Sequence, residues 1–241
     1  MKDHLTPNLS VIVPFFNRRK YLRETLLSIF AEGIREMEII AVDDGSTDRS
    51  FETVRDLEIR FLRLERNQGA PLALNEGLRL ARGNFIAFAD SDDLIVRGGI
   101  SGRLKFLQTN PSSRAVTGTV LGCINEMGKP MNHHPPVALP PLITRSYFEG
   151  GGQITLPLIT TMFRRDYCLE IGNFSPQTLV YDLDYYYRAI QRAPIHYSGE
   201  PVCLYRMHGT NLTIERSGFL SAKAKAHTLL INMKYQMGPR L

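Results

Sequence analysis

The segment Phe85-Ile-Ala-Phe-Ala-Asp-Ser-Asp-Asp93 joins five consecutive apolar residues to three carboxylates within the next four positions. The apolar half is typical of a short strand that is buried on both faces of a parallel sheet. The acidic half begins where that strand is expected to end. Because ligands bind beyond the carboxyl ends of strands in open α/β sheets, the segment predicts both a fold class and the sheet edge that carries a ligand.

The chain before this segment alternates between strand and helix patterns. Short apolar runs predict three further buried strands at residues 9–14, 38–42 and 59–64. Apolar residues at helical spacing predict helices over 21–30 and 72–80, and Gly83 ends the second helix. Regular β-α-β alternation predicts an α/β fold with a doubly wound, mostly parallel sheet flanked by helices.

The pattern becomes irregular in the second half of the chain. Residues 126–152 contain five prolines and the run Gly150-Gly-Gly152, which predicts a long irregular connection. His133-His134 in this connection has no nearby Cys or carboxylate, so we expect no metal site there. Beyond it we expect a helix over 181–192, short strands through 203–205 and a basic helix over 218–237.

The composition limits the class of protein. Apolar residues make up 43% of the 241 residues and charged residues 22%, which suits one folded domain over 1–241. The net charge of +5 resides in residues 216–241, which hold five basic and no acidic side chains, while the rest of the chain is balanced. A nucleic-acid partner is not expected, because the excess charge does not spread over the domain and no reading motif accompanies it.

The cysteines and the apolar runs bear on the compartment. Cys123, Cys168 and Cys203 are far apart and odd in number, which is typical of buried thiols in a reducing compartment. The N-terminal residues lack the apolar run of a secretory signal, and no stretch approaches the roughly 18 apolar residues of a membrane span. We therefore expect a cytoplasmic protein.

Three polar clusters follow predicted strands, at Pro14-Phe-Phe-Asn17, Asp43-Asp-Gly-Ser-Thr-Asp48 and Asp90-Ser-Asp-Asp93. The carboxyl ends of parallel strands meet at one edge, so we expect the clusters to converge. Taken alone, the second cluster is also explained by a turn at Asp44-Gly45 followed by a helix cap at Ser46 or Thr47. Beside the other two, Asp43 and Asp44 become candidates for hydrogen bonds to a nucleotide base and ribose.

The acidic cluster at 90–93 predicts a divalent cation. Carboxylates this close repel one another at the end of a buried strand, which raises their pKa values, and a cation removes that cost. Carboxylate oxygens suit Mg²⁺ or Mn²⁺. An EF-hand calcium loop would need glycine at its sixth position, where this chain has Ile95. A solvated acidic turn is the remaining alternative.

Several of these motifs together resemble the family 2 glycosyltransferases. The resemblance is carried by Ser10-Val-Ile-Val-Pro-Phe-Phe-Asn17, by Glu38-Ile-Ile-Ala-Val-Asp-Asp-Gly-Ser-Thr-Asp48, by Asn67-Gln-Gly69 with Ala73, Asn75, Gly77, Ala81 and Gly83, and by the acidic strand end at 85–93. It is dense over residues 9–93 and returns from Thr161-Met-Phe-Arg-Arg165 to Gly172-Asn-Phe174 and at Asp182-Leu-Asp-Tyr-Tyr-Tyr-Arg188. It implies a GT-A fold, a nucleotide-activated sugar donor and inversion of the anomeric centre.

The resemblance also implies roles for single residues. Pro14, Asp43 and Asp44 would line the nucleoside pocket, and Asp93 would orient the donor sugar. Asp90 would contact the ribose or the metal, and Asp92 would be a metal ligand. His208, in Tyr205-Arg-Met-His-Gly-Thr-Asn211, matches a histidine near the diphosphate and metal, although a lone histidine is equally consistent with a packed or surface residue. The implied donor site further includes Phe16, Asn17, Asn67, Gly69, Asn75 and Ser91.

The same resemblance, together with helix geometry, selects Asp182 as the catalytic base. Asp182 and Asp184 differ by two positions, which places their side chains about 200° apart on a helix, so only one of them easily points into a cleft. Asp182 lies nearer the expected helix start, where an ionised carboxylate is favoured. The alternative is that Asp182 only caps this helix. The family often has Glu before this Asp, whereas this chain has Tyr181, which bears on how the acceptor is positioned.

These inferences predict a metal-dependent, inverting transfer from a nucleotide-diphosphate sugar, with UDP as the expected nucleotide, to an acceptor hydroxyl of a glycan or lipid-linked sugar in polysaccharide or glycan biosynthesis. Residues 9–109 would bind the donor, residues 110–215 would bind the acceptor and hold the base, and residues 216–241 would form the basic helix. A nucleotidyltransferase is disfavoured, because residues 14–24 lack the glycines of a triphosphate-binding loop. An inactive sugar-nucleotide-binding or assembly protein stays open.

The basic helix expected in residues 216–241 has two interpretations. Its apolar side chains lie among lysines, which is compatible with peripheral attachment to an anionic membrane at its inner face. Packing against the body of the protein or against a second subunit is the other interpretation.

Overall fold

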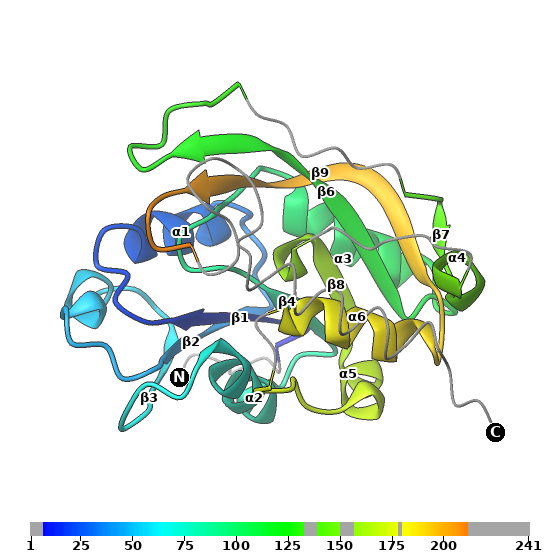
Figure 1. Ribbon diagram of the computed structural model, residues 1–241, viewed down its shortest axis with the longest axis horizontal. Helices are drawn as coiled ribbons and strands as arrows, with labels where there is room; N and C mark the ends of the chain where they lie inside the picture. Colours follow the sequence, from blue (N-terminus) through cyan, green and yellow to red (C-terminus); the bar gives the residue numbers. More distant parts are fainter. Residues whose placement is uncertain (1–6, 133–138, 150–156, 178–179, 212–241) are drawn as a thin grey trace.

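The computed structural model describes residues 7–132, 139–149, 157–177 and 180–211. Within these ranges the chain forms a nine-stranded sheet with helices against both of its faces (Figure 1). The sheet runs in the order β3-β2-β1-β4-β8-β6-β9-β5, and β7 pairs with β9 outside this path. The expected α/β fold class is thus confirmed.

The first half of the sheet is parallel, as the β-α-β pattern predicts. β1 (Leu9–Phe15) lies between β2 (Met37–Asp43) and β4 (Phe85–Phe88), and β2 also pairs with β3 (Arg60–Arg63). The two expected helices are α1 (Leu22–Phe30) and α2 (Ala70–Leu80), and a short 3-10 helix, η1 (Ser50–Thr53), connects β2 to β3. All four strand positions match the prediction to within about two residues, the usual uncertainty of element ends.

The second half of the sheet is mixed, which the sequence pattern did not predict. β8 (Thr161–Arg164) runs antiparallel between β4 and β6 (Ala115–Asn125), and β9 (Ile195–Met207) runs parallel to β6. β5 (Leu94–Ile95) and β7 (Leu142–Ile143) pair with β9 in antiparallel fashion. The remaining elements are α3 (Gly99–Thr109), α4 (Arg145–Glu149), η2 (Leu158–Thr160), α5 (Arg165–Ile171) and α6 (Tyr181–Ile190). β9 is therefore one long strand where only short strands were expected.

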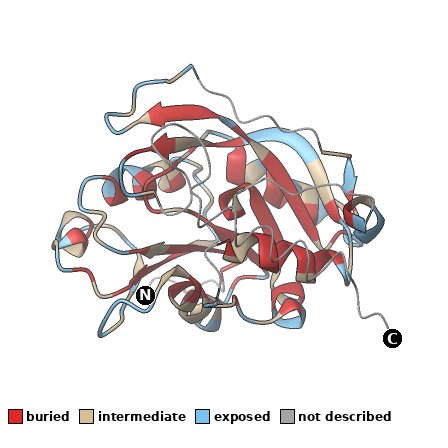
Figure 2. Ribbon diagram, in the orientation of Figure 1, coloured by how far each residue is buried: buried red, intermediate tan, exposed pale blue. Residues whose placement is uncertain are grey.

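The core lies in two layers, one on each face of the sheet. Ile12 of β1 packs with residues of α2, α5 and α6, whereas Val11 and Val13 pack with residues of α1 and α3. This alternation follows from the two-residue period of a strand that is covered on both faces. The inner strands and α6 are accordingly buried, while the outer loops are exposed (Figure 2).

Several expectations fall on residues that the structure does not describe. The basic helix expected over 216–241, with its membrane or subunit contacts, lies outside the described residues, and so does His133-His134. Among the described helices, none is long and apolar enough to cross a membrane. The division into donor-binding and acceptor-binding halves stays a prediction.

Candidate functional site

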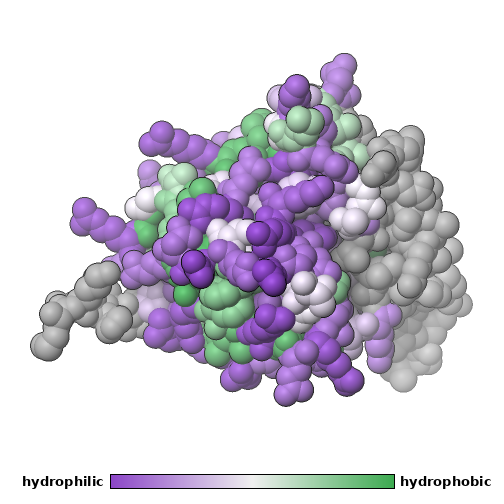
Figure 3. All heavy atoms as spheres, turned by 90° about the vertical axis from the view of Figure 1, so that its left-hand side faces the viewer, coloured by the Kyte–Doolittle hydropathy of each residue, from purple (hydrophilic) through white to green (hydrophobic). Residues whose placement is uncertain are grey.

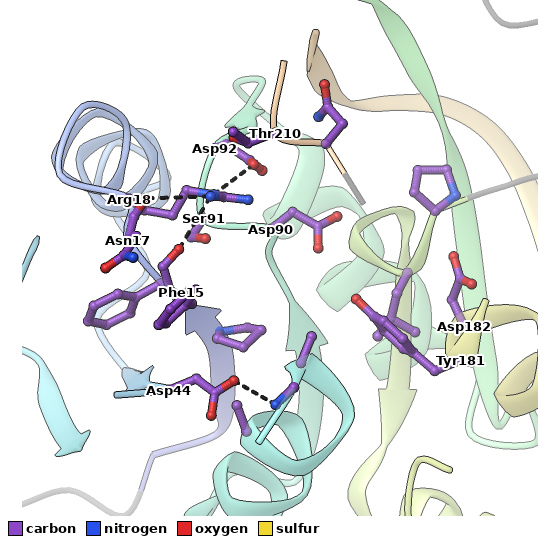
Figure 4. A pocket seen from close by; sticks show the side chains of 18 of the residues that line it. Phe15, Asn17, Arg18, Asp44, Asp90, Ser91, Asp92, Tyr181, Asp182 and Thr210 are labelled. Carbon is purple, nitrogen blue, oxygen red and sulfur yellow. Dashed lines mark hydrogen bonds and ion pairs between the residues drawn. The ribbon is translucent and has the colours of Figure 1, made fainter. Parts of the chain in front are cut away.

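A pocket of about 460 Å³ opens at the carboxyl ends of β1, β2 and β4. β1 points toward the side of the molecule that faces the viewer in Figure 3, and hydrophilic residues cover much of the centre of that side. Figure 4 shows the pocket from close by. Of the residues predicted to form the site, ten line it: Pro14, Phe16, Asn17, Asp44, Asn67, Gly69, Asp90, Ser91, Asp92 and Asp182. The three polar strand ends therefore converge, as expected.

Asp44, after β2, organises one wall of the pocket. Its two carboxylate oxygens accept hydrogen bonds of 2.8 Å from the backbone N–H groups of Gln68 and Gly69. Burial raises the pKa of Asp44, and these two N–H groups partly offset the effect. Gly45 is next, with φ of 73°, and a Cβ there would lie 2.6 Å from the backbone of Arg66. Both residues therefore fix the 66–69 loop against the end of β2.

Asn17 joins the ends of β1 and β2. Its side-chain oxygen accepts a hydrogen bond from the Thr47 N–H at 2.8 Å, and its own N–H donates to the Ser46 hydroxyl at 2.9 Å. The Asn17 backbone is left-handed, with φ of 53°, a conformation that asparagine tolerates better than most residues. The neighbouring Phe16 is exposed on the pocket wall. The turn expected at Asp44-Gly45 is present, with Gly45 at positive φ. The expected helix cap at Ser46 or Thr47 is wrong, because the next helix, η1, has Arg49 as its N-cap residue and no side-chain cap.

Two carboxylates of the acidic cluster, Asp90 and Asp92, face the pocket from the end of β4. Burial, then the nearby carboxylates of Asp92 and Asp182, raise the pKa of Asp90 to about 7, and Arg18 opposes the shift. Asp92 behaves in the opposite way. Burial alone would raise its pKa, but hydrogen bonding from His208 and the charge of Arg18 lower it below the ordinary value. Of these two carboxylates, Asp92 forms an ion pair with Arg18, and Asp90 forms none with the residues that the structure describes.

His208 is buried behind Asp92. Its Nε2 lies 2.9 Å from Asp92 Oδ2, and its Nδ1 lies 3.2 Å from the Thr210 backbone N–H, which can only donate. Nδ1 is therefore the acceptor, and Nε2 carries the proton that is donated to Asp92. The ring also stacks on Tyr21, with ring centres 4.9 Å apart. In this tautomer His208 orients Asp92, and it could ligate a metal through Nε2 only after losing that proton.

Asp93 turns away from the pocket toward β9. Its Oδ1 accepts a hydrogen bond from the Arg206 N–H at 2.7 Å, while its Oδ2 has no partner among the residues described. Burial and the charges of Asp92 and Asp90 hold the pKa of Asp93 well above its ordinary value. Arg206 donates from Nε to the Asp92 carbonyl oxygen at 2.7 Å and from Nη2 to Glu24 at 2.6 Å. This buried arginine therefore braces the acidic loop against α1 and β9.

Asp182 lies in the first turn of α6 and lines the pocket, whereas Asp184 is buried against Arg188, with 2.9 Å between Oδ2 and Nε. The opposite facing expected from helix geometry is confirmed. Burial raises the pKa of Asp182 to about 6, partly offset by the N–H groups of Leu183 and Asp182 itself. The Leu183 N–H donates to Asp182 Oδ1 at 2.8 Å, but the N-cap residue of α6 is Val180 and no side chain caps this helix, so Asp182 is not the cap that the alternative expected. Tyr181 stands beside Asp182 in the pocket (Figure 4).

Four predicted site residues do not line the pocket: Asp43, Asn75, Asp93 and His208. Asp43 is buried, and its Oδ1 accepts a 2.8 Å hydrogen bond from the Ser46 N–H. Asn75 exchanges two hydrogen bonds, of 3.0 and 2.7 Å, with the backbone of Phe174 and so ties α2 to the segment after α5. These four side chains make contacts that support the segments around the pocket. Their direct roles in ligand or metal binding stay predictions.

The structure also brings in lining residues that the sequence analysis did not select, among them Arg18, Tyr205, Thr210 and Asn211. Arg18 immediately follows Asn17 in the first polar cluster, so its position after a strand could have identified it. Thr210 and Asn211 follow His208 in the motif already quoted. Tyr205 is the first residue of the same motif, but a tyrosine near the end of a strand is ordinary and does not by itself indicate a site.

The donor atoms around Asp90 fit a divalent cation in part. Among the residues described, none donates a hydrogen bond to the Asp90 carboxylate, and its pKa is raised first by burial and then by neighbouring carboxylates, a cost to the charged form that a cation would offset. No group of three or more His, Cys, Asp and Glu residues within the described ranges is arranged to hold a metal ion. Mg²⁺ and its analogues commonly bind one or two carboxylates together with substrate phosphates. Asp90 and Asp92 therefore suit a cation that arrives with a phosphate ligand.

Comparison with known proteins places this architecture in a family. Residues 10–172 match the family model described as glycosyl transferase family 2. An uncharacterized glycosyltransferase of Haemophilus influenzae is 36% identical over 109 residues, which cover 43% of this chain and 44% of the relative. The chain thus aligns with less than half the length of this relative.

Solved structures share the fold at low sequence identity. Staphylococcus aureus TarS 1-349 in complex with UDP-GlcNAc superposes with a TM-score of 0.72 at 22% identity, over 97% of this chain and 68% of that one. The mannosyltransferase PcManGT of Pyrobaculum calidifontis, in complex with GDP-Man and Mn²⁺, gives a TM-score of 0.65 at 20% identity, over 87% and 60% of the two chains.

Proposed function

The chain belongs to glycosyl transferase family 2, and from this premise we propose that it transfers a sugar from a nucleotide-diphosphate donor to an acceptor hydroxyl. One observation carries the proposal. The ends of β1, β2 and β4 and the start of α6 place Asp44, Asp90, Asp92 and Asp182 around one pocket of about 460 Å³. Such a pocket is large enough for a small-molecule ligand and is placed where open α/β sheets bind nucleotides.

The donor is proposed to lie between the β1 and β2 ends and the acidic loop. Asp44 and the 66–69 loop would hold the nucleoside, and Phe16 offers an aromatic surface beside it. We propose a UDP-sugar, because the TarS neighbour was solved with UDP-GlcNAc. The Pyrobaculum neighbour was solved with GDP-Man, so a nucleotide screen must decide the base.

Asp90 and Asp92 would hold a Mg²⁺ or Mn²⁺ ion, with His208 orienting Asp92. A divalent ion bound there would neutralise the diphosphate leaving group. The presence of Mn²⁺ in the Pyrobaculum neighbour supports this proposal. The residues of this chain contribute by keeping Asp92 ionised and by fixing the acidic loop through Arg206.

Asp182 is proposed as the base in a single displacement. Its carboxylate would take the proton of the acceptor hydroxyl while that oxygen attacks the anomeric carbon, which inverts the centre and releases the nucleoside diphosphate. A pKa near 6 suits this role, because Asp182 is then mostly ionised at neutral pH and still basic enough to accept a proton. The acceptor is proposed to be a sugar hydroxyl of a glycan or lipid-linked sugar, which would place the reaction in glycan or polysaccharide synthesis.

One observation favours a second candidate, a sugar-nucleotide-binding protein without transferase activity. Tyr181 lines the pocket where the family pattern often has a glutamate, so a carboxylate expected beside the base is missing. Release of free nucleoside diphosphate from a donor separates the two candidates, because a binding protein releases none.

A panel of sugar nucleotides, each with and without Mn²⁺, tests the proposal by thermal shift and by assay of released nucleoside diphosphate. Ligand that binds only the folded state raises its apparent stability, so the true donor should raise Tm in a metal-dependent manner. Asp92→Ala should abolish that metal-dependent shift while the protein stays folded. Asp166→Ala is the matched control, because Asp166 lies on α5 with an exposed side chain.

The assignment of Asp92 would be wrong if Asp92→Ala bound UDP as tightly as the wild-type protein and still required metal. The proposed function itself would be wrong if no sugar nucleotide stabilised the wild-type protein at all.

A further inference from the structure

The pocket has a marked imbalance of charge. Its lining includes four carboxylates, from Asp44, Asp90, Asp92 and Asp182, and one cationic side chain, Arg18, among the residues described. A nucleotide diphosphate brings further negative charge into the same space. Like charges at short range in a partly buried site repel strongly, so the donor needs cations that the pocket must either hold or admit.

Arg18 lies three residues beyond the end of β1, and its side chain lines the pocket and reaches Asp92. The Arg18 backbone N–H donates to the Ser50 hydroxyl at 2.8 Å, which fixes the backbone from which the side chain extends. Its Nε donates to Asp92 Oδ2 at 3.0 Å, and its Nη1 makes longer contacts of 3.3 and 3.4 Å with the carbonyl oxygens of Phe16 and Asn17. Nη2 makes no hydrogen bond with any described residue, so the guanidinium keeps donors available to a ligand.

The contact of Arg18 with Asp92 occupies one oxygen, Oδ2, of the carboxylate that is proposed to hold the divalent ion. Asp92 Oδ2 accepts from both Arg18 and His208, and Figure 4 shows the Arg18 side chain extending to Asp92 beside Asp90. A divalent ion on Asp92 would lie close to the guanidinium and would be repelled by it. Arg18 and the metal are therefore competitors for one carboxylate until an anion enters that can bind both.

We propose that Arg18 is the counterion of Asp92 in the ligand-free protein and becomes a ligand of the donor diphosphate when a divalent ion binds Asp92. This inference rests on the proposed function, since it takes the ligand to be a nucleoside diphosphate. Arginine suits the exchange because its planar, multiply donating guanidinium binds carboxylates and phosphates alike. It follows that Arg18 opposes metal binding without nucleotide and supports nucleotide binding with metal.

If Arg18 exchanges partners in this way, replacing it should strengthen the binding of metal alone and weaken the binding of nucleotide. In Arg18→Gln, Mn²⁺ alone should bind more tightly than in the wild-type protein, by roughly threefold or more, because a competing cation is removed. UDP in the presence of saturating Mn²⁺ should bind at least about tenfold more weakly, because charge-assisted hydrogen bonds to phosphate are lost. Arg18→Lys should fall between the two for UDP, since it keeps the charge without the planar set of donors.

The measurements are Mn²⁺ binding, from the electron paramagnetic resonance signal of the free ion, and UDP binding by calorimetry at saturating Mn²⁺. Arg19→Gln is the matched control. It removes the same charge one residue away, but Arg19 is not among the lining residues of this pocket, and its side chain pairs with Glu52 instead. Both affinities should stay at the wild-type values in this control, apart from a small long-range effect that added salt reduces.

Three results would contradict the exchange proposed for Arg18. If substitution only distorted the loop after β1, Arg18→Gln would bind both Mn²⁺ and UDP more weakly than the wild-type protein. That result would overturn the proposed exchange. Unchanged UDP affinity in Arg18→Gln, while the wild-type protein binds UDP with Mn²⁺, would overturn this inference alone. Failure of the wild-type protein to bind UDP would overturn the choice of UDP, and failure to bind any nucleoside diphosphate would overturn the proposed function along with this inference.

Discussion

At the scale of single residues, position along a helix separates two acids of similar chemistry. Asp182 and Asp184 lie in the first turn of α6, yet Asp182 lines the pocket and Asp184 pairs with Arg188 four positions further on. The pKa of Asp182 rises to about 6 because the side chain is desolvated without a cationic partner. Environment, rather than residue type, thus gives the two carboxylates different chemistry.

Asp182 should impose an acid limb on the pH profile of sugar transfer. Below a pH of about 6 its carboxylate is protonated and cannot accept a proton, so kcat/KM should rise with pH up to that value and then level off. Asp182→Asn should keep donor binding but lose about 100-fold or more of kcat. The profile is measured with saturating metal and a true donor.

Asp184→Asn is the comparison, and it should keep both the activity and the acid limb of the wild-type protein. If Asp184→Asn is inactive while Asp182→Asn transfers at the wild-type rate, the wrong carboxylate has been assigned.

At the scale of elements, the site depends on contacts between segments that the chain order separates widely. Arg206 near the end of β9 donates to the Asp92 carbonyl oxygen, to Glu24 on α1 and, at 3.3 Å, to the carbonyl oxygens of Asn125 and Glu126. Its side chain is buried and stands 5.1 Å from the ring centre of Tyr21. The Arg206 side chain therefore connects the acidic loop, α1 and the end of β6.

Removing this brace should destabilise the fold. Arg206→Met leaves buried carbonyl oxygens without donors, and the free energy of unfolding should fall by about 2–4 kcal/mol. Urea unfolding measures the change. Arg79→Met serves as the control, because Arg79 is an exposed residue of α2 that pairs with the exposed end of Glu76 on the same helix, and it should change stability by less than about 0.5 kcal/mol. Equal stability of the two variants would show that the brace carries no net energy.

At the scale of the whole molecule, ionisation of a carboxylate in the pocket affects both cation binding and the stability of the fold. The carboxyl of Asp90 has a pKa of about 7 in the folded protein against an ordinary value of 3.8, mainly because it is buried. Between those values the folded state binds more protons than the unfolded state, so this group makes stability fall as pH rises. A cation at the site would relieve the cost and so favour the folded state.

Asp90→Asn should therefore remove a pH-dependent penalty. In metal-free protein, its Tm relative to the wild-type protein should increase as pH rises from about 5 to about 8, because only the wild-type side chain becomes charged in that range. Thermal unfolding of both proteins across this range measures the difference. Mn²⁺ with UDP should raise the Tm of the wild-type protein more than that of the variant.

A Tm difference that stays constant with pH would contradict the raised pKa of Asp90. A larger metal-dependent shift in the variant would contradict its assignment as a ligand.

The sequence by itself determined the parallel half of the sheet and the edge that carries the pocket. Strands such as 85–88 are short apolar runs, and the polar residues after them are local features that need no knowledge of distant contacts. The opposite facing of Asp182 and Asp184 also followed from local geometry, since side chains two positions apart on a helix face nearly opposite ways, whereas the catalytic role of Asp182 stays a prediction. These features rest on periodicity, which a single sequence displays directly.

Only the tertiary structure decided what long-range pairing controls. β6 contains strand-forming residues interrupted by Gly118 and Gly122, and its place in the sheet depends on pairing with β8 and β9. Asp90, Asp92 and Asp93 look alike in sequence, yet Asp93 turns toward Arg206 while Asp92 meets Arg18 and His208, which lie 74 and 116 positions away. The direction of each carboxylate is set by its partner, and the partners come together only when the strands assemble into the sheet.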